Sequence, residues 1–505
     1  MSLFVRESTG LVREVGPFRA FLMSLGYNGF LAIPFVYMPG VFLFGKGAIP
    51  YIAIVLSWII FTPAVALWYM ITRQYPRTGA DYVYFSRLNP RVGFAAWFNF
   101  TLGEMLYDAV LVYFAVTQLD MVLEAMGNPA YKPLSSPIVE FAVSVALLAI
   151  IIGVNMASAR AGLDLFTAIS IVAVASFIAS AIYLLTLPRS LIASSLSGYY
   201  SEALKYANEA KPTGGLFGLL GMVAFTTAVW AYVNYPATIG GEIRRDRLTT
   251  LMGVVGMFIF GGLALTLFVA SYLASLTPGF IIGAGYMYAN GIDSGSILVN
   301  PGALLALINT PMAHVLALTS ILWYIAPVTG VVIQVSRYLL AFSMDRVLPE
   351  VVSYVHPRTH SPIVAHAIDL AVTIILMAIL LLTPFSSAFM YALNLDAVVL
   401  LVYTFMASML LAIPYYARGV TKIRGLGRGP ALALSVVYLL VLGIFAYYWL
   451  TYPQYYLSIS GSAPLILVES SPFFIIGIVA YEAARIIRAR QGIPLEAIYA
   501  EIPPE

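Results

Sequence analysis

The stretch SLGYNGF, residues 24–30, interrupts the first long apolar segment of the chain, residues 17–44. Two glycines three residues apart flank Asn28 within this stretch. Glycine loses more backbone freedom than other residues when it becomes helical, so this pair weakens a helix and frees backbone polar groups. The sequence therefore predicts a helix that is broken at residues 25–29.

A second stretch of this kind, WAYVNYP at residues 230–236, lies in the apolar segment 215–242. Pro236 has no N–H group, and its ring clashes with the carbonyl of Tyr232 in a regular helix. We therefore predict a second break at residues 231–235, which like the first contains a Tyr and an Asn. Because Gly and Pro also serve as packing and kink residues in membrane helices, one break alone would be a weak signal.

The composition requires most of the chain to lie outside water. Hydrophobic residues make up 61% of the sequence and charged residues 10%, whereas soluble domains have about one-quarter charged residues. The apolar residues fall in runs of about 20, the length that an α-helix needs to cross a bilayer. Alternating strand patterns of a membrane barrel are not seen, so the sequence predicts an all-α membrane protein. With no cysteine, disulfides and thiolate metal sites are excluded.

The apolar segments predict twelve transmembrane helices. They lie at residues 17–44, 49–73, 92–124, 137–157, 162–187, 215–242, 249–275, 310–342, 363–383, 387–416, 430–451 and 471–489. Long insertions at 76–91 and 276–309 occupy equivalent places if helices 1–5 and 6–10 are two halves of opposite orientation, and such a 5+5 inverted repeat with broken helices 1 and 6 is common in secondary transporters. The predicted regions are an N-terminus at 1–16, a ten-helix transport core at 17–416, two C-terminal helices at 417–490 and a tail at 491–505.

Basic residues are distributed unequally between the two sides of this arrangement. Only five of the 26 Lys and Arg residues fall on the side opposite the N-terminus: Lys46, Lys132, Arg189, Lys205 and Lys211. The other 21 lie on the N-terminal side. The positive-inside rule therefore predicts a multi-pass protein of the cell membrane with both termini in the cytoplasm.

The two breaks suit a zwitterionic solute. Half-helix N-termini offer N–H groups to a carboxylate, and unwound carbonyls accept hydrogen bonds from an ammonium group, so no charged side chain is needed for the head of an α-amino acid. The predicted substrate-binding residues are Gly26, Tyr27, Asn28, Gly29, Trp230, Ala231, Tyr232, Val233 and Asn234. The aromatic residues among them equally suit simple packing between helices.

Acidic residues in the middle of apolar segments are candidates for ion coupling, since each costs about 2.5–3.5 kcal/mol on insertion scales. Glu104 and Asp108 are four residues apart and share one face of a helix. They could relay protons, hold a cation, contact a cationic substrate or form a neutral hydrogen-bonded pair. Asp396 and Asp369 are the other central acids.

Four further stretches share a pattern with one superfamily. They are YPRTGADYVY at 75–84, GGEIRRD at 240–246, SRYLLAFSMDRVLP with the following HPRTHSP within 336–362, and NMASARAGLDL at 155–165. These stretches resemble corresponding segments of the amino acid–polyamine–organocation (APC) superfamily. The third match is the most specific, because the superfamily carries Ser-Arg, an acidic residue, Leu-Pro and a later Thr-Pro at this spacing, and this sequence has Ser-Pro at the last of these positions.

The resemblance implies the inverted-repeat fold and the transport of amino acids or related amines. Sodium-coupled relatives surround the ion with hydroxyls and carbonyls, for which this sequence offers Thr329. Some proton-coupled relatives use a lysine in helix 5, and residues 162–187 contain none. We therefore favour coupling to H⁺ through Glu104 and Asp108 over Na⁺, with uncoupled exchange as the alternative. The sequence departs from the superfamily pattern at both breaks, so the resemblance does not identify the substrate.

Other classes of protein find less support. The sequence has no Gly-x-Ser-x-Gly or His-Glu-x-x-His motif, and the stretch GVFLFGKG at 40–47 lacks the Ser or Thr that ends a phosphate-binding loop. The four histidines are scattered, so we predict neither an enzyme nor a metal or cofactor site, and no nucleic-acid partner. The expected partners are the amino acid or amine, H⁺ and the lipid bilayer. A channel or a solute sensor of the same fold remains the less favoured alternative.

Overall fold

The structure is entirely helical, as the sequence predicts. The computed structural model describes residues 11, 13–27, 38–87, 89–227, 230, 235–244, 246–292, 294–383, 425–452 and 463–500. Within these ranges there is no β-strand, and the extended pairing is limited to two isolated bridges, Val15 with Ile243 and Thr78 with Ile239. Both bridges lie at the same end of the molecule, where they join loops to helix ends.

The first half of the chain forms ten described helices. They are α1 (Pro17–Gly26), α2 (Met38–Phe44), α3 (Ile49–Gln74), α4 (Ala80–Ser86), α5 (Pro90–Ala125), α6 (Tyr131–Leu134), α7 (Pro137–Ala157), α8 (Ala159–Thr186), α9 (Arg189–Ser195) and α10 (Ser197–Ala210). Capping side chains define where some of these helices begin. Asn89 precedes α5 and accepts a hydrogen bond from the backbone N–H of Val92, and Ser158 caps α8 in the same manner.

The second half of the chain contains both long helices and short helical turns. They are α11 (Gly215–Thr227), α12 (Tyr235–Thr238), α13 (Arg247–Leu251), the π-helical turn η3 (Met252–Gly256), α14 (Met257–Leu276), α15 (Pro278–Ala289), α16 (Gly295–Val299), α17 (Pro301–Leu307), α18 (Pro311–Thr319), α19 (Leu322–Met344), the 3₁₀ turn η4 (Glu350–Ser353), α20 (Ile363–Leu382), α22 (Arg428–Thr451), α23 (Ala463–Arg490) and α24 (Leu495–Tyr499).

The predicted spans agree with several observed helices to within three residues at each end, including α3, α5, α7, α8 and α20. The predicted span 310–342 is instead two helices, α18 and α19, separated by a turn at Ser320 and Ile321. The predicted span 249–275 contains the π-helical turn η3. The Ser24 hydroxyl donates a hydrogen bond to the carbonyl of Gly253 in this turn, which gives a physical reason for the local departure from α-helical pairing.

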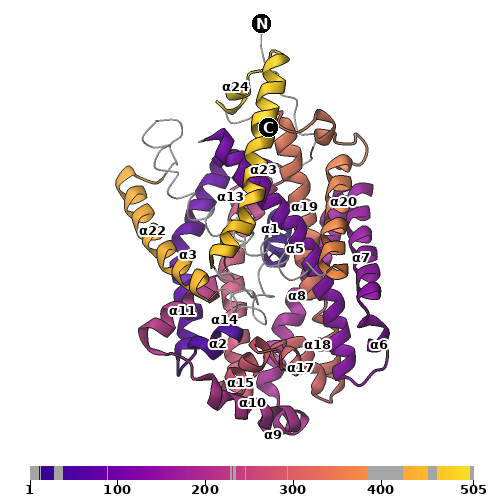
Figure 1. The fold of residues 1–505 in the computed structure, drawn as a ribbon, viewed down its shortest axis with the longest axis vertical. Coiled ribbons are helices and arrows are strands. Elements are labelled where there is room, and N and C mark those ends of the chain that lie inside the picture. Colours follow the sequence, from indigo (N-terminus) through magenta and orange to yellow (C-terminus); the bar gives the residue numbers. More distant parts are fainter. Residues whose placement is uncertain are drawn as a thin grey trace.

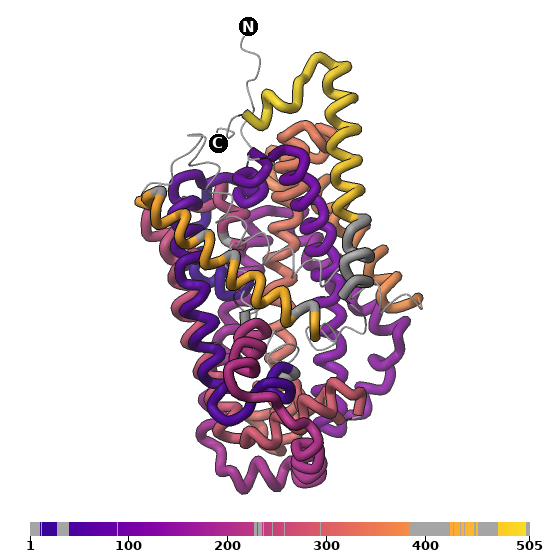
Figure 2. Tube along the Cα trace, turned by 60° about the vertical axis from the view of Figure 1, so that its left-hand side comes forward, coloured from indigo at the N-terminus to yellow at the C-terminus, as the bar shows by residue number. Residues whose placement is uncertain are grey.

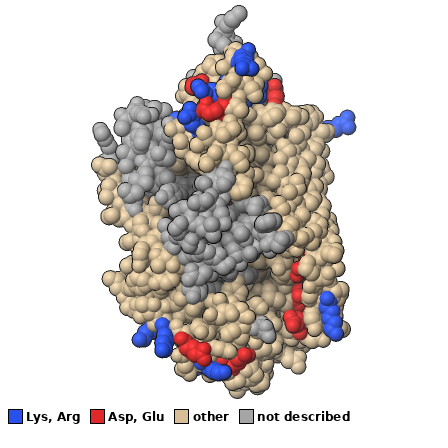
Figure 3. All heavy atoms as spheres, viewed as in Figure 1, with Lys and Arg blue, Asp and Glu red and all other residues tan. Residues whose placement is uncertain are grey.

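Eight helices in the described part of the chain are long and apolar enough to cross a membrane. Their outer surfaces expose large apolar side chains, among them Ile138, Ile150, Ile182, Leu185, Val437 and Leu440. On the face drawn in Figure 3, the charged side chains gather toward the two ends, and the described part of the middle shows residues other than Lys, Arg, Asp and Glu. Such a belt is what contact with hydrocarbon requires, because charged groups are costly there.

The helices form one bundle whose two ends differ (Figure 1). We call the end that carries α4, residues 239–246, the last turn of α19 and α24 the terminal face, and the end that carries α9, α10, α15 and α17 the opposite face. The C-terminal helices pack on the outside of the bundle (Figure 2). In α22, the Tyr448 hydroxyl donates to the carbonyl of Phe217 in α11 at 2.7 Å, and α23 packs along α5.

Candidate functional site

A buried ion pair joins two of the stretches that resemble the APC superfamily. Arg337 of α19 donates from Nε to Glu242 Oε1 and from Nη2 to Glu242 Oε2, both at 2.8 Å. Each of the two side chains is only 2% exposed. The Ser336 hydroxyl accepts a further bond from Arg337 Nη1 at 2.8 Å. This bidentate geometry is the strong form of a charge-assisted hydrogen bond, and it fixes the segment after α12 to α19.

The stretch at 75–84 meets the same end of α19. The Tyr338 hydroxyl donates to Asp81 Oδ2 at 2.6 Å, and both residues are buried. Gly79, just before α4, has φ +61°, and a Cβ there would lie 2.9 Å from the Cβ of Ala341. Only glycine adopts this backbone conformation freely. Its N–H donates to the carbonyl of Thr238 at 2.7 Å, so the turn before α4 is held against both α12 and α19.

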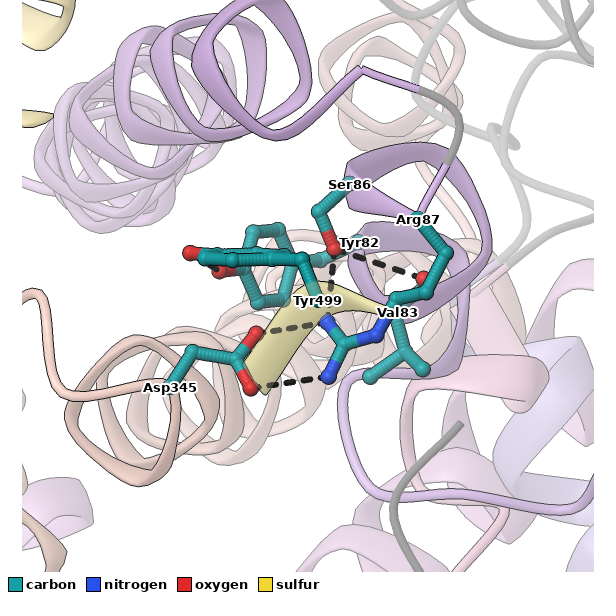
Figure 4. A network of polar contacts seen from close by, with 6 residues as sticks. All are labelled: Tyr82, Val83, Ser86, Arg87, Asp345 and Tyr499. Carbon is teal, nitrogen blue, oxygen red and sulfur yellow. Dashed lines mark hydrogen bonds and ion pairs between the residues drawn. The ribbon is translucent and has the colours of Figure 1, made fainter. Parts of the chain in front are cut away.

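A second buried ion pair closes the terminal face (Figure 4). Arg87, at the end of α4, binds Asp345 at the end of α19 through Nη1–Oδ2 at 2.6 Å and Nη2–Oδ1 at 2.8 Å. Burial alone would lower the pKa of the Arg87 guanidinium, but the Asp345 carboxylate outweighs burial and raises it. Tyr499 of α24 completes the cluster. Its ring lies 5.0 Å from the Arg87 guanidinium, and its hydroxyl is 2.8 Å from that of Tyr82.

The described part of the predicted substrate site centres on Tyr27. Helix α1 ends at Gly26, and Tyr27 is its C-cap. The Tyr27 hydroxyl donates to the carbonyl of Gly330 in α19 at 2.9 Å, and a Cβ at Gly330 would lie 2.3 Å from the Tyr27 ring. The ring also contacts Phe166 of α8 and Tyr235, the first residue of α12, edge-on at 4.9 and 5.1 Å between centroids. The ends of the two predicted broken elements therefore touch.

Trp230 lies in a different environment from Tyr27. Its indole N–H donates to the Ser57 hydroxyl of α3 at 2.7 Å. Its ring stacks on Trp58 and meets Phe258 of α14 edge-on, with centroids 6.4 and 5.5 Å apart. Its recorded ring contacts are thus to α3 and α14 and not to Tyr27. The other predicted substrate-binding residues lie outside the part that the structure describes: Asn28, Gly29, Ala231, Tyr232, Val233 and Asn234.

The predicted coupling acids lie next to this tyrosine cluster. The Tyr235 hydroxyl donates to Glu104 Oε1 of α5 at 2.6 Å. Glu104 and Asp108 are both buried. The second oxygen of Glu104 and both oxygens of Asp108 accept no hydrogen bond from any residue in the described ranges. Asp369 of α20 interacts electrostatically with Asp108; one of its oxygens accepts from Thr373 at 3.2 Å, and the other accepts no bond within the same ranges.

The remaining candidates contribute less to this arrangement. Thr329 is buried in α19, and its hydroxyl donates to the carbonyl of Ala326 in the same helix at 2.6 Å. Asp396 lies outside the described residues. Over the ranges that the structure covers, no three Asp, Glu or His side chains are grouped as metal ligands.

A network of neutral groups joins α5 to the second half of the chain toward the opposite face. Gln118 of α5 donates to the Ser320 hydroxyl at 2.8 Å and accepts a hydrogen bond from Asn300. Asn300 also caps α17, because its side-chain oxygen accepts from the N–H of Gly302 at 3.0 Å. The sequence pattern does not predict this network. Its only sequence signal is an amide side chain, Gln118, shortly after the apolar run 109–116 of α5.

Two residues of the site were also missed or undervalued. Tyr235 falls inside the predicted break at 231–235 but was not chosen as a site residue, although it is the one that reaches Glu104. Asp369 was recognised as a central acid without a partner. Sequence position alone does not show that α20 packs against α5, which is what brings Asp369 toward Asp108.

Comparison with known proteins identifies the family of this chain. The chain matches the family model described as amino acid permease over residues 15–480. None of the curated proteins matches the chain. The family match covers all four stretches that carry the resemblance, as well as Tyr27, Glu104 and Asp108. The chain therefore belongs to the amino acid permease family of the APC superfamily, whose members are multi-pass membrane proteins that transport amino acids and are not enzymes.

Proposed function

We propose that this permease is a secondary active transporter that moves amino acids or related amines by alternating access, coupled to protons through Glu104 and Asp108. The observation that carries this proposal is the hydroxyl of Tyr235, which bonds to Glu104 while its ring rests against Tyr27. One residue thus links the predicted substrate site to the predicted coupling acids. A conformational change at either site therefore reaches the other through the contacts of Tyr235.

The arrangement of the helices supports an inverted repeat of two five-helix halves within twelve spans. In the first half α1 ends at Gly26, and the next described helix begins at Met38. In the second half α11 ends at Thr227, and α12 begins at Tyr235. Helix α1 thus ends inside the predicted break at residues 25–29, and α12 begins at the last residue of the predicted break at 231–235. We place the amino acid between them, with its charged head on backbone groups of the broken helices.

The burial of the acids supports protons as the coupling ion. An ionised carboxylate that is buried without a cation or hydrogen-bond donor is very costly, whereas the neutral acid is tolerated. Asp108 accepts no hydrogen bond in the described part of the chain, and the groups that interact with it electrostatically are the acids Asp369 and Glu104. We infer that Asp108 takes up and releases a proton as the site opens alternately to water on the two sides.

The terminal face supplies the gate in this scheme. The ion pairs Arg337–Glu242 and Arg87–Asp345 join α19 to the segment after α12 and to α4. Opening a path to the terminal side requires these elements to separate. The excess of Lys and Arg on this side supports its assignment to the cytoplasm, with both termini there.

Transport by purified protein in liposomes tests the proposal. Labelled amino acids and amines are screened first for saturable uptake, which distinguishes a carrier from a channel. With a transported solute in hand, we expect an inward proton gradient to stimulate uptake by the wild type. Asp108→Asn should abolish that stimulation and retain exchange of internal for external solute, because a neutral amide cannot carry a proton.

Asp120→Asn is the matched control, since it makes the same change in the same helix. Asp120 is at the exposed end of α5, where its carboxylate accepts from the Ser135 hydroxyl at 3.1 Å. This variant should keep its response to the proton gradient. Gradient-stimulated uptake by Asp108→Asn equal to that of Asp120→Asn would reject the proton role of Asp108. Wild-type uptake that ignores both proton and sodium gradients would identify an exchanger without ion coupling.

A further inference from the structure

A pocket of about 360 Å³ opens on the terminal face beside the end of α3. Its walls come from the end of α3 with the residues that follow it, and from residues 240, 243, 244, 246, 247 and 250, before and at the start of α13. Four of its lining residues are basic: Arg73, Arg77, Arg244 and Arg247. The pocket lies apart from Tyr27, Glu104 and Asp108, and the transport mechanism makes no use of it.

Among the described residues, three of the four pocket arginines lack a carboxylate partner. Its one acidic lining residue is Asp246, whose carboxylate accepts hydrogen bonds from the Thr249 hydroxyl at 2.6 Å and from the Thr249 N–H at 2.7 Å. These bonds lower the pKa of Asp246 and commit its charge to capping α13. In the part of the chain covered by the structure, Arg73, Arg244 and Arg247 form no ion pair with a carboxylate.

Other arginines near the ends of the spans do have carboxylate partners. The observed pairs are Arg19 with Asp164, Arg91 and Arg485 with Glu482, and Arg346 with Glu350. The pocket also contains an unused neutral donor. The hydroxyl of Thr72 is buried, and no residue in the described ranges bonds to it. The pocket therefore offers several hydrogen-bond donors to an anion, and few acceptors among the described residues compete for them.

The pocket lies beside the ends of two candidate membrane spans. The candidate span formed by α3 ends at Gln74, and another candidate span begins at Arg247. The lining arginines are thus at the level of lipid headgroups, where basic pockets between helices bind anionic lipids. Beyond the pocket, Leu248 and Leu263 expose apolar side chains on the surface of α13 and α14. A headgroup in the pocket would leave acyl chains against this apolar surface.

We propose that the arginine pocket binds the phosphate group of an anionic phospholipid from the membrane leaflet at the terminal face. Phosphate is the matching chemistry, because the planar guanidinium group donates two parallel hydrogen bonds to its oxygens. Arg244 belongs to the segment that also carries Glu242, the partner of Arg337. A bound lipid therefore holds the position of a segment that forms the gate.

The experiment measures lipid binding directly and does not depend on transport. Purified protein is titrated with phosphatidylglycerol in detergent, and bound lipid is counted by native mass spectrometry. We expect the double variant Arg244→Gln/Arg247→Gln to bind the first lipid at least about tenfold more weakly, since each lost charge-assisted bond contributes about 1.5 kcal/mol or more. Phosphatidylcholine, which carries no net charge, should bind the wild type more weakly than phosphatidylglycerol.

The matched control removes two charges from the same face outside the pocket, in Arg160→Gln/Arg358→Gln. Both side chains are exposed, and this variant should bind phosphatidylglycerol like the wild type. Equal loss in both double variants, or in neither, overturns the pocket as a lipid site. A second arm replaces the lipid with inorganic phosphate or glycerol phosphate. Binding of these soluble ions that depends on Arg244 and Arg247, without a matching effect on lipid, overturns the lipid assignment in favour of a free phosphate.

Discussion

The two ends of the bundle are closed by different chemistry. On the terminal face, the contacts between α19 and the neighbouring segments are bidentate ion pairs, Arg337–Glu242 and Arg87–Asp345, which are almost completely buried. Toward the opposite face, the corresponding link between α5 and the second half of the chain is a neutral network of Gln118, Asn300 and Ser320. Both are inaccessible to water in this structure.

The difference in chemistry predicts a difference in how the two ends respond to change. A buried ion pair that loses one partner leaves an uncompensated charge in a poorly polar environment. A buried neutral pair that loses one partner leaves an unsatisfied dipole, which is less costly. A single substitution in an ion pair of the terminal face should therefore lower the free energy of unfolding more than a single substitution in the neutral network toward the opposite face.

The largest effect is expected from breaking the pair Arg337–Glu242. Arg337→Ala should lower the free energy of unfolding by about 3–5 kcal/mol, because Glu242 then stays buried without a counter-charge. The measurement is denaturant or thermal unfolding in detergent. The double variant Arg337→Met/Glu242→Leu should recover much of that loss, since it removes both charges. This account would be contradicted if the double variant had a lower free energy of unfolding than Arg337→Ala, with the losses from the two substitutions simply adding.

A smaller effect is expected from Gln118→Ala toward the opposite face. The substitution leaves the Asn300 amide and the Ser320 hydroxyl with one partner fewer, so the free energy of unfolding should fall by about 1–3 kcal/mol. Because the chain has no cysteine, a single introduced thiol reports local opening. Gln118→Ala should speed the alkylation of Ala303→Cys and leave that of Thr78→Cys unchanged. Faster alkylation of both thiols would mean that the two ends are not independent.

Tyr499 of α24 tests how much a neutral hydrogen bond contributes to the stability of the terminal face. Tyr499→Phe removes the hydroxyl that contacts Tyr82 at 2.8 Å but keeps the ring beside Arg87. The expected loss is about 0.5–1.5 kcal/mol in the free energy of unfolding. Tyr447→Phe, at an exposed position of α22, is the control and should change stability less. A loss at Tyr499 as large as that at Arg337 would show that the hydroxyl bond, and not the ion pairs, dominates this face.

Much of this fold could be predicted from the sequence, because hydrocarbon imposes simple requirements on composition and length. The ends of α3 and α7 follow from apolar runs bounded by Pro and by polar residues, and Gly26 correctly indicates where α1 stops. The pairing of distant charges could not be predicted in this way. Arg337 and Glu242 were both visible as charges near the ends of apolar segments, but their contact depends on how α19 packs against the chain after α12.

The candidate site was predictable to a similar extent. The sequence identified Tyr27, Glu104 and Asp108 individually from an unusual glycine pair and from acids in an apolar helix. It did not show that Tyr235 connects them. In the sequence, Tyr235 is a tyrosine before a proline like many others near helix ends. Its contacts with Glu104 and Tyr27 are apparent only in the three-dimensional structure. The register of helix packing determines such contacts, and it is encoded in side-chain shape along whole helices and not in a short motif.

The smallest effect is expected at an ion pair that shares the chemistry of Arg337–Glu242 but not its burial. Arg346 and Glu350 also lie on the terminal face, with Nη1 and Oε2 3.0 Å apart, but the Glu350 side chain is 74% exposed. Exposed pairs contribute about 0–1 kcal/mol, because water already solvates both charges. Glu350→Gln should therefore leave the unfolding transition nearly unchanged. A large loss of unfolding free energy in Glu350→Gln would show that charge itself stabilises this face. A negligible loss would mean that Arg337→Ala is destabilising because its ion pair is buried. Burial of charge is the property that separates the two ends of the bundle.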